Sequence, residues 1–337
     1  MWTVTQFSTI TRRKILNRRR PSTRGGALLA VLWLSAALSA IAYSLANTVR
    51  GEVERTSTAV DGLRTYYLAR GGVERGILYV QWRNTIPPDS PLKYRPGNPV
   101  LRFTFPSGQA WVEVVPETAK MNINTAPPLD LMRLLAGMGV DLGRAEQIAA
   151  AIVDWRTPAG ITAFDAFYQS LTPSFRARHA SFEETEELLL VRGMTPELYY
   201  GGYDHDAAGH LVPRAGLRDC VSVFGSKGAF DVNTAQPAVL VAIGFSSQAA
   251  AAIVARRRGQ PFQNAGEVAE FLGGSPALGR LRVGGNAIFT LRSTARIQLP
   301  NGQLSDLRRT VAATVIFRPD EDIKLQTLRW YDNAWTP

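Results

Sequence analysis

Two acidic residues near the middle of the chain have the spacing of a cation ligand set. Asp204 and Asp206 are separated by one residue and are followed by Gly209. Oxygen ligands at alternate positions, followed by a glycine turn, can begin a calcium-binding loop, with Asp204 and Asp206 as the metal ligands. No glutamate follows at the position where an EF-hand supplies its bidentate ligand. A polar turn is therefore the favoured interpretation, and a calcium site is the alternative.

Three consecutive arginines, Arg256, Arg257 and Arg258, are the second candidate for chemistry. Guanidinium groups at a helix end can clamp a phosphate, although a basic helix end that only complements the helix dipole is commoner. The chain has one cysteine, Cys220, and three histidines, and it contains no nucleophile elbow, Walker loop, zinc-ligand spacing or dinucleotide-binding glycine motif. The sequence therefore predicts neither an enzyme nor a disulfide framework.

The N-terminal region contains the most apolar stretch of the chain. Residues 27–46 carry no charge, and as a helix they span roughly 30 Å, the thickness of a bilayer core. Residues 1–25 contain seven basic side chains and no acidic one, which predicts a cytoplasmic N-terminus and an extracytoplasmic remainder. Without those seven charges, 31 basic residues face 28 acidic ones, so the formal net charge of +10 does not require a nucleic-acid partner.

Two glycines, Gly25 and Gly26, stand at the boundary between the basic and the apolar segments. A secretory signal has its small residues after the apolar core, whereas here they precede it, so cleavage would leave the apolar helix on the mature chain. This arrangement resembles a type IV prepilin leader, and the resemblance implies cleavage between Gly25 and Gly26. It also places Ala30 at the fifth mature position, where most pilins have a glutamate. The alternative is a simple signal anchor.

Helical character continues beyond the apolar run. Apolar residues recur at alternating steps of three and four, which makes one stripe. The stripe is expected to contact partner helices during assembly through three residues: Val53, Val60 and Tyr67. Residues 27–85 contain no proline, so one helix of about 55 residues is expected, and two shorter helices are the alternative. Gly71 and Gly72 indicate a kink.

Alternating apolar residues predict strands on both sides of a long helical region. The pairs 101–105 with 110–115 and 287–299 with 306–318 each flank a turn, which is typical of hairpins, and a last strand is expected over 324–331. Between the hairpins, about 170 residues read as almost entirely helical. Because a lone hairpin is only marginally stable, we expect one antiparallel sheet interrupted by an all-helical insertion.

The expected insertion contains an internal repeat. Residues 122–128, Asn-Ile-Asn-Thr-Ala-Pro-Pro, recur as residues 231–237, Asp-Val-Asn-Thr-Ala-Gln-Pro. In each copy a glycine turn and a second helix with an Ala-Ile-Val core follow, which is a helix-hairpin-helix pattern. Asn122 or Asp231, with the threonine, is expected to cap the first helix, and the proline fits its opening turn.

Two families resemble this pattern. Membrane-anchored competence proteins that capture DNA share the Asn-x-Asn-Thr-Ala segment and a glycine hairpin. This likeness makes a membrane-anchored extracytoplasmic helix-hairpin-helix DNA-binding protein the alternative function. Minor pseudopilin K of type II secretion is similar over residues 24–331, including the leader and the segments 120–126, 152–156 and 187–194. The chain is therefore identified as a member of the pseudopilin K family.

The resemblance to pseudopilin K implies an assembly protein without enzymatic activity. It implies a place at the tip of the periplasmic pseudopilus, where the subunit initiates or caps assembly for protein secretion together with minor pseudopilins I and J. It further implies processing and methylation by a prepilin peptidase, a single inner-membrane span and a periplasmic C-terminal domain, with nucleic acid an unlikely partner. Calcium is reported for relatives, but this chain departs from their pattern at two places. The acidic cluster before the Asn-x-Asn-Thr segment is reduced to Glu117, and the acidic residues after Asp-Trp-Arg are replaced by Thr157-Pro158.

The predicted fold is α+β, with a pilin-like N-terminal helix packed on an antiparallel sheet and a large all-helical insertion of two helix-hairpin-helix or SAM-like repeats. The expected boundaries follow the chain: leader 1–25, membrane helix 26–46, periplasmic helix 47–83, first sheet part 84–118, first repeat 119–216, second repeat 217–280 and second sheet part 281–337.

Overall fold

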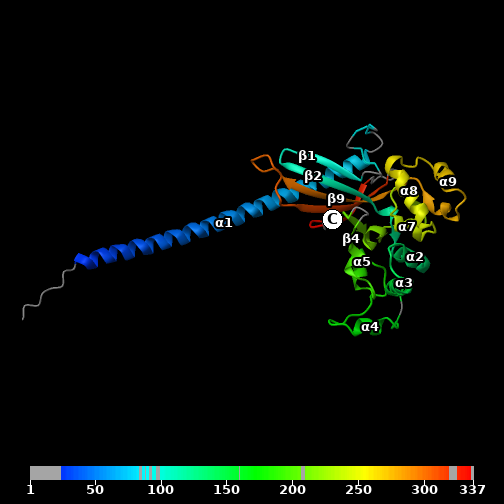
Figure 1. The fold of residues 1–337 in the computed structure, drawn as a ribbon, viewed down its shortest axis with the longest axis horizontal. Helices are drawn as coiled ribbons and strands as arrows, with labels where there is room; N and C mark the ends of the chain where they lie inside the picture. The colour runs from blue at the N-terminus through cyan, green and yellow to red at the C-terminus, as the bar shows by residue number, and fades with distance from the viewer. Residues whose placement is uncertain are drawn as a thin grey trace, which may run out of the picture. The chain divides into compact units, whose positions relative to one another are not determined.

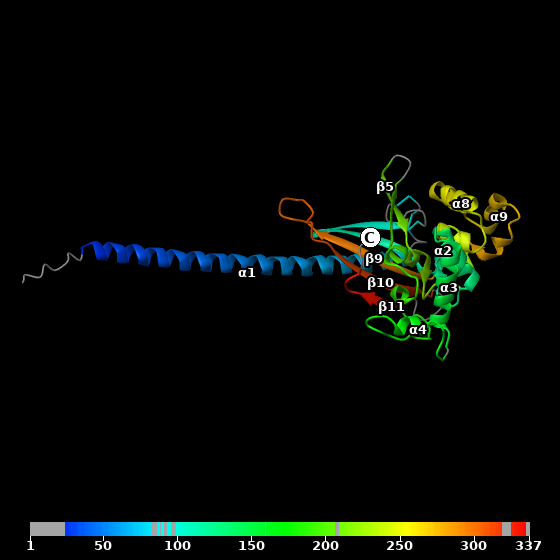
Figure 2. The ribbon, with the colours of Figure 1, turned by 60° about the horizontal axis from the view of Figure 1, so that its bottom comes forward.

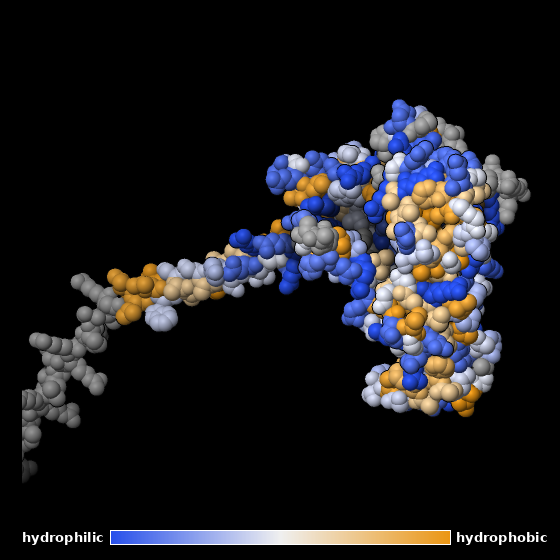
Figure 3. Space-filling view, turned by 45° about the vertical axis from the view of Figure 1, so that its right-hand side comes forward, coloured by the Kyte–Doolittle hydropathy of each residue, from blue (hydrophilic) through white to orange (hydrophobic). Residues whose placement is uncertain are grey.

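The computed structural model describes residues 24–82, 86–87, 89–90, 93–95, 99–158, 160–205, 209–318 and 325–334. The chain divides into two compact units, Met1–Val60 and Asp61–Pro337. In the first unit the described residues belong to helix α1 (Arg24–Gln81; Figure 1). The apolar part of this helix is exposed (Figure 3). Within the described part of the chain, α1 is the one helix long and apolar enough to cross a membrane.

Helix α1 is a single helix of 58 residues that passes through the glycine pair 71–72, so the expected single helix is found and not the two shorter helices of the alternative. Gly72 lets the helix approach the sheet closely. A Cβ atom at Gly72 would lie 2.9 Å from the Ala110 Cβ and 2.3 Å from the Ser293 hydroxyl oxygen. Only a residue without a side chain fits between these neighbours.

The first core of the second unit lies between the end of α1 and the sheet. Buried residues at steps of three and four form the inner face of the helix, as in Ala69, Val73 and Val80. Strand residues alternate between buried and partly exposed, so one face of the sheet supplies the apolar partners, including Val112 and Leu291. The predicted packing of the long helix on one antiparallel sheet is confirmed.

Five antiparallel strands form this sheet in the order β1-β2-β9-β10-β11. Their bounds are β1 (Val100–Phe105), β2 (Gly108–Pro116), β9 (Ile288–Ile297), β10 (Arg309–Phe317) and β11 (Leu325–Tyr331). Strand β2 pairs with β9 along its whole length, with Glu113 opposite Arg292. Segments far apart in the chain therefore lie side by side, as the cyan and orange strands of Figure 1 show, and everything between β2 and β9 is an insertion.

The insertion is rich in helices. They are α2 (Pro128–Gly137), α3 (Leu142–Arg156), α4 (Asp165–Gln169), α5 (Pro196–Tyr200), α6 (Leu217–Cys220), α7 (Pro237–Ala242), α8 (Ser247–Gly259) and α9 (Ala265–Leu272), with 3-10 turns η1 (Glu117–Ala119), η2 (Thr185–Leu190) and η3 (Pro276–Arg280). Helices α2 with α3 and α7 with α8 form the two predicted helical pairs, and α2 packs against α7. Their buried side chains form a second core, separate from that of the sheet.

The expectation of an all-helical insertion needs a correction, because the insertion also contains short strands. They are β3 (Met121–Asn122), β4 (Gly201–His205), β5 (Leu211–Ala215), β6 (Val221–Ser222), β7 (Phe230–Asp231) and β8 (Leu281–Arg282). Each repeat begins with a buried extended dipeptide, β3 or β7, whose backbone groups need partners and find them in β6 or β8. Strands β4 and β5 form a hairpin that extends away from the helices (Figure 2).

Candidate functional sites

The three apolar residues predicted to mediate assembly lie on the surface of α1. Val53, Val60 and Tyr67 expose 61%, 42% and 58% of their surface. Leu63, on the same side of the helix, exposes 57%. Exposed aliphatic and aromatic side chains at helical spacing form a surface that another helix can cover. The stripe is therefore available for contact, and its use in assembly stays a prediction.

The predicted processing site lies at the start of the same helix. Gly25 and Gly26 belong to the first turn of α1, and Ala30 is exposed one turn further along. A glycine has no side chain, so the backbone at this boundary is open to close approach by another protein. Cleavage between the two glycines, and the meaning of Ala30 for assembly, stay predictions.

The repeated Asn-Thr-Ala segments form two matched loops in the insertion. The Asn124 side chain binds both backbone groups of Phe182, donating from Nδ2 to the carbonyl oxygen at 2.9 Å and accepting from the amide nitrogen at 2.7 Å. Asn233 does the same with Phe262, at 2.8 and 2.9 Å. Each asparagine thereby ties the start of its repeat to the aromatic residue that follows the second helix.

The expectation that Asn122 and Asp231 cap the first helices is wrong. Helices α2 and α7 have a proline in the first turn, as predicted, but no side chain caps them. The Asn122 Oδ1 accepts from the Asn124 amide at 2.9 Å, and the Asp231 Oδ1 accepts from the Asn233 amide at 3.2 Å. These two side chains therefore stabilise the loop before each helix. The loop amide two residues after each side chain lies nearer to it than the amides of the helix do.

An arginine at the end of each second helix closes the loop from the other side. Arg257 donates from Nη1 to the carbonyl oxygens of Val232 at 2.8 Å and Ala235 at 2.7 Å. Burial lowers the pKa of its guanidinium to about 10. In the first copy Arg156 donates to the equivalent carbonyls, those of Ile123 and Ala126. The sequence gives no signal for this role of the two arginines, because their partners are backbone atoms.

The three arginines predicted as a possible phosphate clamp do not form one. Arg256 pairs with Glu267 at 3.2 Å, and its guanidinium lies 4.2 Å from the centre of the Phe262 ring. Arg257 is turned inward to the loop carbonyls, which leaves Arg258 as the exposed member of the run. Two of the three positive charges of this helix end therefore serve the packing of the second repeat.

A buried ion pair connects the two repeats. The Asp130 carboxylate on α2 is 4% exposed and accepts two bonds from the Arg280 guanidinium, at 2.6 and 3.1 Å. Nearby, a Cβ atom at Gly137 would lie 3.2 Å from Val241 on α7, so the two first helices approach closely. A buried charge is tolerated only with such a partner. Asp130 and Arg280 therefore fix how the repeats pack.

Of the two predicted calcium ligands, Asp204 and Asp206, the structure describes Asp204. Asp204 lies on β4 with its carboxylate 3.8 Å from the guanidinium of Arg214 on β5, and Asp206 lies outside the described residues. Glu117 is buried and pairs with Lys120 at 3.2 Å. In the portion of the chain that the structure describes, no three His, Cys, Asp or Glu side chains are grouped to hold a metal ion.

One polar pair in the first repeat has no signal in the sequence. His179 has a φ of +46°, and its ring nitrogens face the Asp154 carbonyl at 3.2 Å and the Asp165 carboxylate at 3.1 Å. Burial lowers the pKa of His179, but its contacts with the carboxylate and the carbonyl raise it more, so the pKa is raised overall. Only the protonated ring donates to both acceptors. The pair joins helix α4 to the end of α3.

Because the asparagine bridges are buried to different degrees, their removal should differ in cost. Asn233 is 6% exposed, so Asn233→Ala leaves two buried backbone groups of Phe262 without partners and should cost roughly 2–4 kcal/mol of unfolding free energy. Asn124 is more exposed, and water can replace part of its bridge, so Asn124→Ala should cost about half as much. Denaturant unfolding of the full chain in detergent measures both.

Asn301→Ala is the control for these two substitutions. Asn301 is exposed in the turn between β9 and β10 and also bonds a backbone amide, that of Gln303 at 3.0 Å. Its removal should change stability by less than about 0.5 kcal/mol. Equal losses for Asn233→Ala and Asn301→Ala would contradict the bridging role.

Two family models match the insertion, both described as type II secretion system (T2SS), protein K. One matches residues 115–201 and the other residues 230–282. They therefore cover the two helical repeats separately and include both Asn-Thr-Ala loops.

Similar proteins carry the same description. The type II secretion system protein K of Klebsiella pneumoniae is 27% identical over 197 residues, which is 52% of this chain and 60% of that protein. The protein K of Pectobacterium carotovorum subsp. carotovorum is 27% identical over 201 residues, 53% of this chain and 61% of that protein. The aligned part of the chain thus spans about three fifths of each relative.

A solved structure shares the fold. It is a chain in the crystal structure of the GspK-GspI-GspJ complex from the type 2 secretion system of enterotoxigenic Escherichia coli. The TM-score is 0.57 at 17% identity, over 85% of this chain and 100% of that one. In the family models over both repeats and in the likeness to two curated relatives, the chain is similar to type II secretion system protein K.

Proposed function

We propose that this protein is a minor pseudopilin of a type II secretion system. It acts at the tip of the periplasmic pseudopilus, where it initiates or caps assembly for protein secretion together with the minor pseudopilins I and J. Its role is structural and not enzymatic. The observation that carries the proposal is the division of helix α1. The last part of the helix packs on the sheet and contributes to its buried core. An apolar stripe that contains Val53 and Val60 remains exposed.

The first part of α1 anchors the protein in the inner membrane. The apolar run is long enough to span the bilayer, and the seven basic residues before Gly25 favour a cytoplasmic N-terminus and a periplasmic domain. A prepilin peptidase cleaves between Gly25 and Gly26. The helix that remains bundles with partner helices, and Ala30 supplies no carboxylate to pair with the amine of a subunit next to it.

The insertion suits a terminal position. It is bulky, and its two repeats are joined to each other by the Asp130–Arg280 ion pair and packed α2 against α7. This subunit lacks the carboxylate that would pair with a neighbouring amine, and it carries a bulky insertion beside the sheet. An internal position in the filament would therefore add little favourable packing. Differential packing is therefore the proposed mechanism of capping.

DNA binding, the alternative function, finds no support at the repeats. Two of the three clustered arginines are engaged inside the second repeat, with Glu267 and with loop carbonyls. Phosphate binding requires guanidinium and amide groups that face outward. The repeats resemble DNA-binding hairpins in sequence but use the same residues for packing.

Replacement of the stripe tests the assembly role. The triple variant Val53→Lys, Val60→Lys, Tyr67→Lys should reduce co-purification with the two partner pseudopilins by roughly tenfold or more, because three lysines cannot be buried between helices without partners. The three side chains are exposed, so the melting temperature of the sheet domain should stay unchanged. Pull-down from membranes with a C-terminal tag measures the first effect, and thermal unfolding measures the second.

The control places two lysines on the opposite side of the same helix, at Thr48 and Thr58, which are also exposed. This variant should co-purify like the natural protein. An intact complex after substitution of the stripe, or tagged protein found periodically along filaments and not at one end, would show that the proposed role is wrong.

A further inference from the structure

The last strand, β11, contacts a different part of the second unit with each of its faces. On one face Trp330 packs against the core between α1 and the sheet, and the Arg70 guanidinium lies 5.6 Å from the centre of its ring. The Trp330 Nε1 and the Tyr66 hydroxyl both donate to the Asp332 carboxylate, at 2.8 and 2.6 Å. This face therefore fixes β11 to helix α1.

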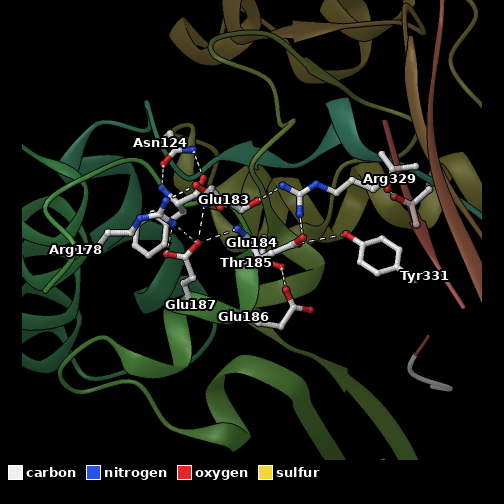
Figure 4. A network of polar contacts seen from close by, with 12 residues as sticks. Asn124, Arg178, Glu183, Glu184, Thr185, Glu186, Glu187, Arg329 and Tyr331 are labelled. Atoms are coloured by element: carbon white, nitrogen blue, oxygen red, sulfur yellow. Dashed lines mark hydrogen bonds and ion pairs between the residues drawn. The ribbon is translucent and has the colours of Figure 1, made fainter. Parts of the chain in front are cut away.

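The opposite face of β11 reaches the insertion. Figure 4 shows Arg329 and Tyr331 pointing from the strand toward Glu183 and Glu184. Arg329 donates to the Glu183 carbonyl oxygen at 2.5 Å and forms an ion pair with the Glu184 carboxylate. The Tyr331 hydroxyl donates to the Glu184 Oε2 at 3.2 Å. The guanidinium also lies 5.6 Å from the centre of the Phe224 ring, so it contacts two segments of the insertion.

The partner segment is held in place before it meets the strand. The Glu187 carboxylate accepts from the amides of Glu183 at 2.7 Å and Glu184 at 3.1 Å, and it pairs with Arg178 at 3.3 Å. Arg178 also pairs with the Glu183 carboxylate. Figure 4 shows this cluster continuing to Asn124, which binds the backbone of Phe182. The Glu183–Glu184 corner is thus rigidly connected to the first repeat.

The chain enters and leaves the insertion at one place. The Thr118 hydroxyl, after β2, donates to the Asn286 Oδ1, before β9, at 2.9 Å. Asn286 in turn donates to Asp231 at 2.8 Å. The two connecting segments are therefore adjacent, and a body attached through one such place can turn about it.

A cavity of about 670 Å³ separates the insertion from the polar face of the sheet. It is lined by Thr290 and Arg292 of the sheet and by Tyr199 of the insertion, and both Glu117 at the connection and Glu184 at the β11 contact border it. Since the insertion does not pack directly on this part of the sheet, the angle between the two depends on the β11 contact.

We propose that Arg329 and Tyr331 are positioning residues that form a latch, which fixes the orientation of the insertion relative to the sheet. When the latch opens, the insertion turns about the connection at Thr118 and Asn286, and the cavity widens. Because β11 is also fixed to α1 through Trp330, the latch sets the orientation of the insertion relative to the end of the helix. The idea that this orientation affects capping of the pseudopilus rests on the proposed function, whereas the latch itself does not.

Distance measurement between spin labels tests the latch in the full chain in detergent. One label is placed at Thr104 on β1 and the other at Glu146 on α3, both exposed. Cys220 is 1% exposed and burial raises the pKa of its thiol to about 12, so it stays unlabelled. The natural sequence should give one narrow distance distribution. Arg329→Gln should raise the fraction of molecules outside that peak by roughly threefold to tenfold, the loss expected for one partly exposed ion pair with added hydrogen bonds.

The matched control is Arg296→Gln. Arg296 also pairs with a carboxylate, that of Asp306 at 3.3 Å, but this pair belongs to the β9–β10 hairpin. Its removal should leave the distribution unchanged. Exchange of the charges, Arg329→Glu with Glu184→Arg, should restore much of the narrow peak if the ion pair holds the orientation.

An unchanged distribution in Arg329→Gln would overturn the proposal. If Arg329→Gln fails to fold, the charge-exchanged variant decides: a narrow peak supports the latch and a broad one overturns it. Tyr331→Phe removes a single hydroxyl and should broaden the peak less than Arg329→Gln. Because the readout is a distance within one chain, failure of the latch leaves the stripe experiment and the proposed function unaffected.

Discussion

Replacing Gly25 with leucine is expected to abolish maturation, so that the full-length precursor accumulates and no chain beginning at Gly26 is recovered. A peptidase must bring its catalytic groups against the backbone at the scissile bond, and a glycine offers no side chain in the way. Gly25 and Gly26 also weaken the first turn of α1, whereas leucine is a strong helix former and would hold the turn closed. Electrophoretic mobility and N-terminal sequencing of membrane-derived protein measure the outcome.

Gly51→Leu serves as the control for maturation. Gly51 lies further along the same helix, and a Cβ atom there meets nothing within 4 Å. This variant should mature normally. A natural chain that starts after Ala46, or that stays uncut in cells with an active prepilin peptidase, would contradict the pilin-like processing on which the proposed function relies.

Replacing Gly72 with alanine is expected to destabilise the fold by roughly 1–3 kcal/mol. The added methyl group would lie 2.9 Å from the Ala110 Cβ and 2.3 Å from the Ser293 hydroxyl, so α1 must move away from the sheet. Adding Ser293→Ala removes the nearer clash and should recover part of the loss. Thermal or denaturant unfolding of the full chain in detergent measures both changes.

Gly71→Ala is the matched control, one residue earlier in the same helix. A Cβ atom at Gly71 lies 4.0 Å from the Phe105 ring, an ordinary contact. Alanine costs less entropy than glycine in a helix, so this substitution should stabilise the protein by about 0.5–1 kcal/mol. Stability changes of opposite sign at these two neighbouring positions distinguish a helix–sheet clash from a general effect of removing glycine. The same loss at both positions would refute the close-approach explanation.

The long helix, the sheet and the repeat follow from local patterns that need no tertiary information. The apolar run and the stripe repeat at the helical period, and the hairpins alternate at the strand period, so each element is recorded in neighbouring residues. The interruption of the sheet was also predictable, because two separate hairpins require a common sheet to be stable. The structure confirms the strands at both ends, from Val100–Phe105 to Leu325–Tyr331.

The roles of the polar residues could not be predicted in the same way. Asn122 was expected to cap a helix, yet its side chain accepts from the Asn124 amide. The Asn124 side chain in turn binds the backbone of Phe182, 58 residues later. Arg257 was weighed as a phosphate ligand because it is basic, yet it donates to two carbonyl oxygens. Any residue can supply a backbone partner, so no sequence pattern records such a contact.

The sequence by itself determined the long helix, the strands of the large sheet and the two helical pairs, which part of the chain suits a membrane, and which segment is repeated. It did not determine the short strands of the insertion. Only the tertiary structure decided what the charged and glycine residues do. Gly72 was expected to mark a kink in the helix, and the structure shows that it is a point of contact with the sheet. The sequence could not indicate this, because the spacing between a helix and a sheet depends on residues from distant strands. Arg329 and Glu184 gave no signal, because they lie 145 positions apart and meet only when β11 completes the sheet. Burial and long-range pairing determine whether a charged side chain stabilises or destabilises the protein, and both exist only in the folded chain.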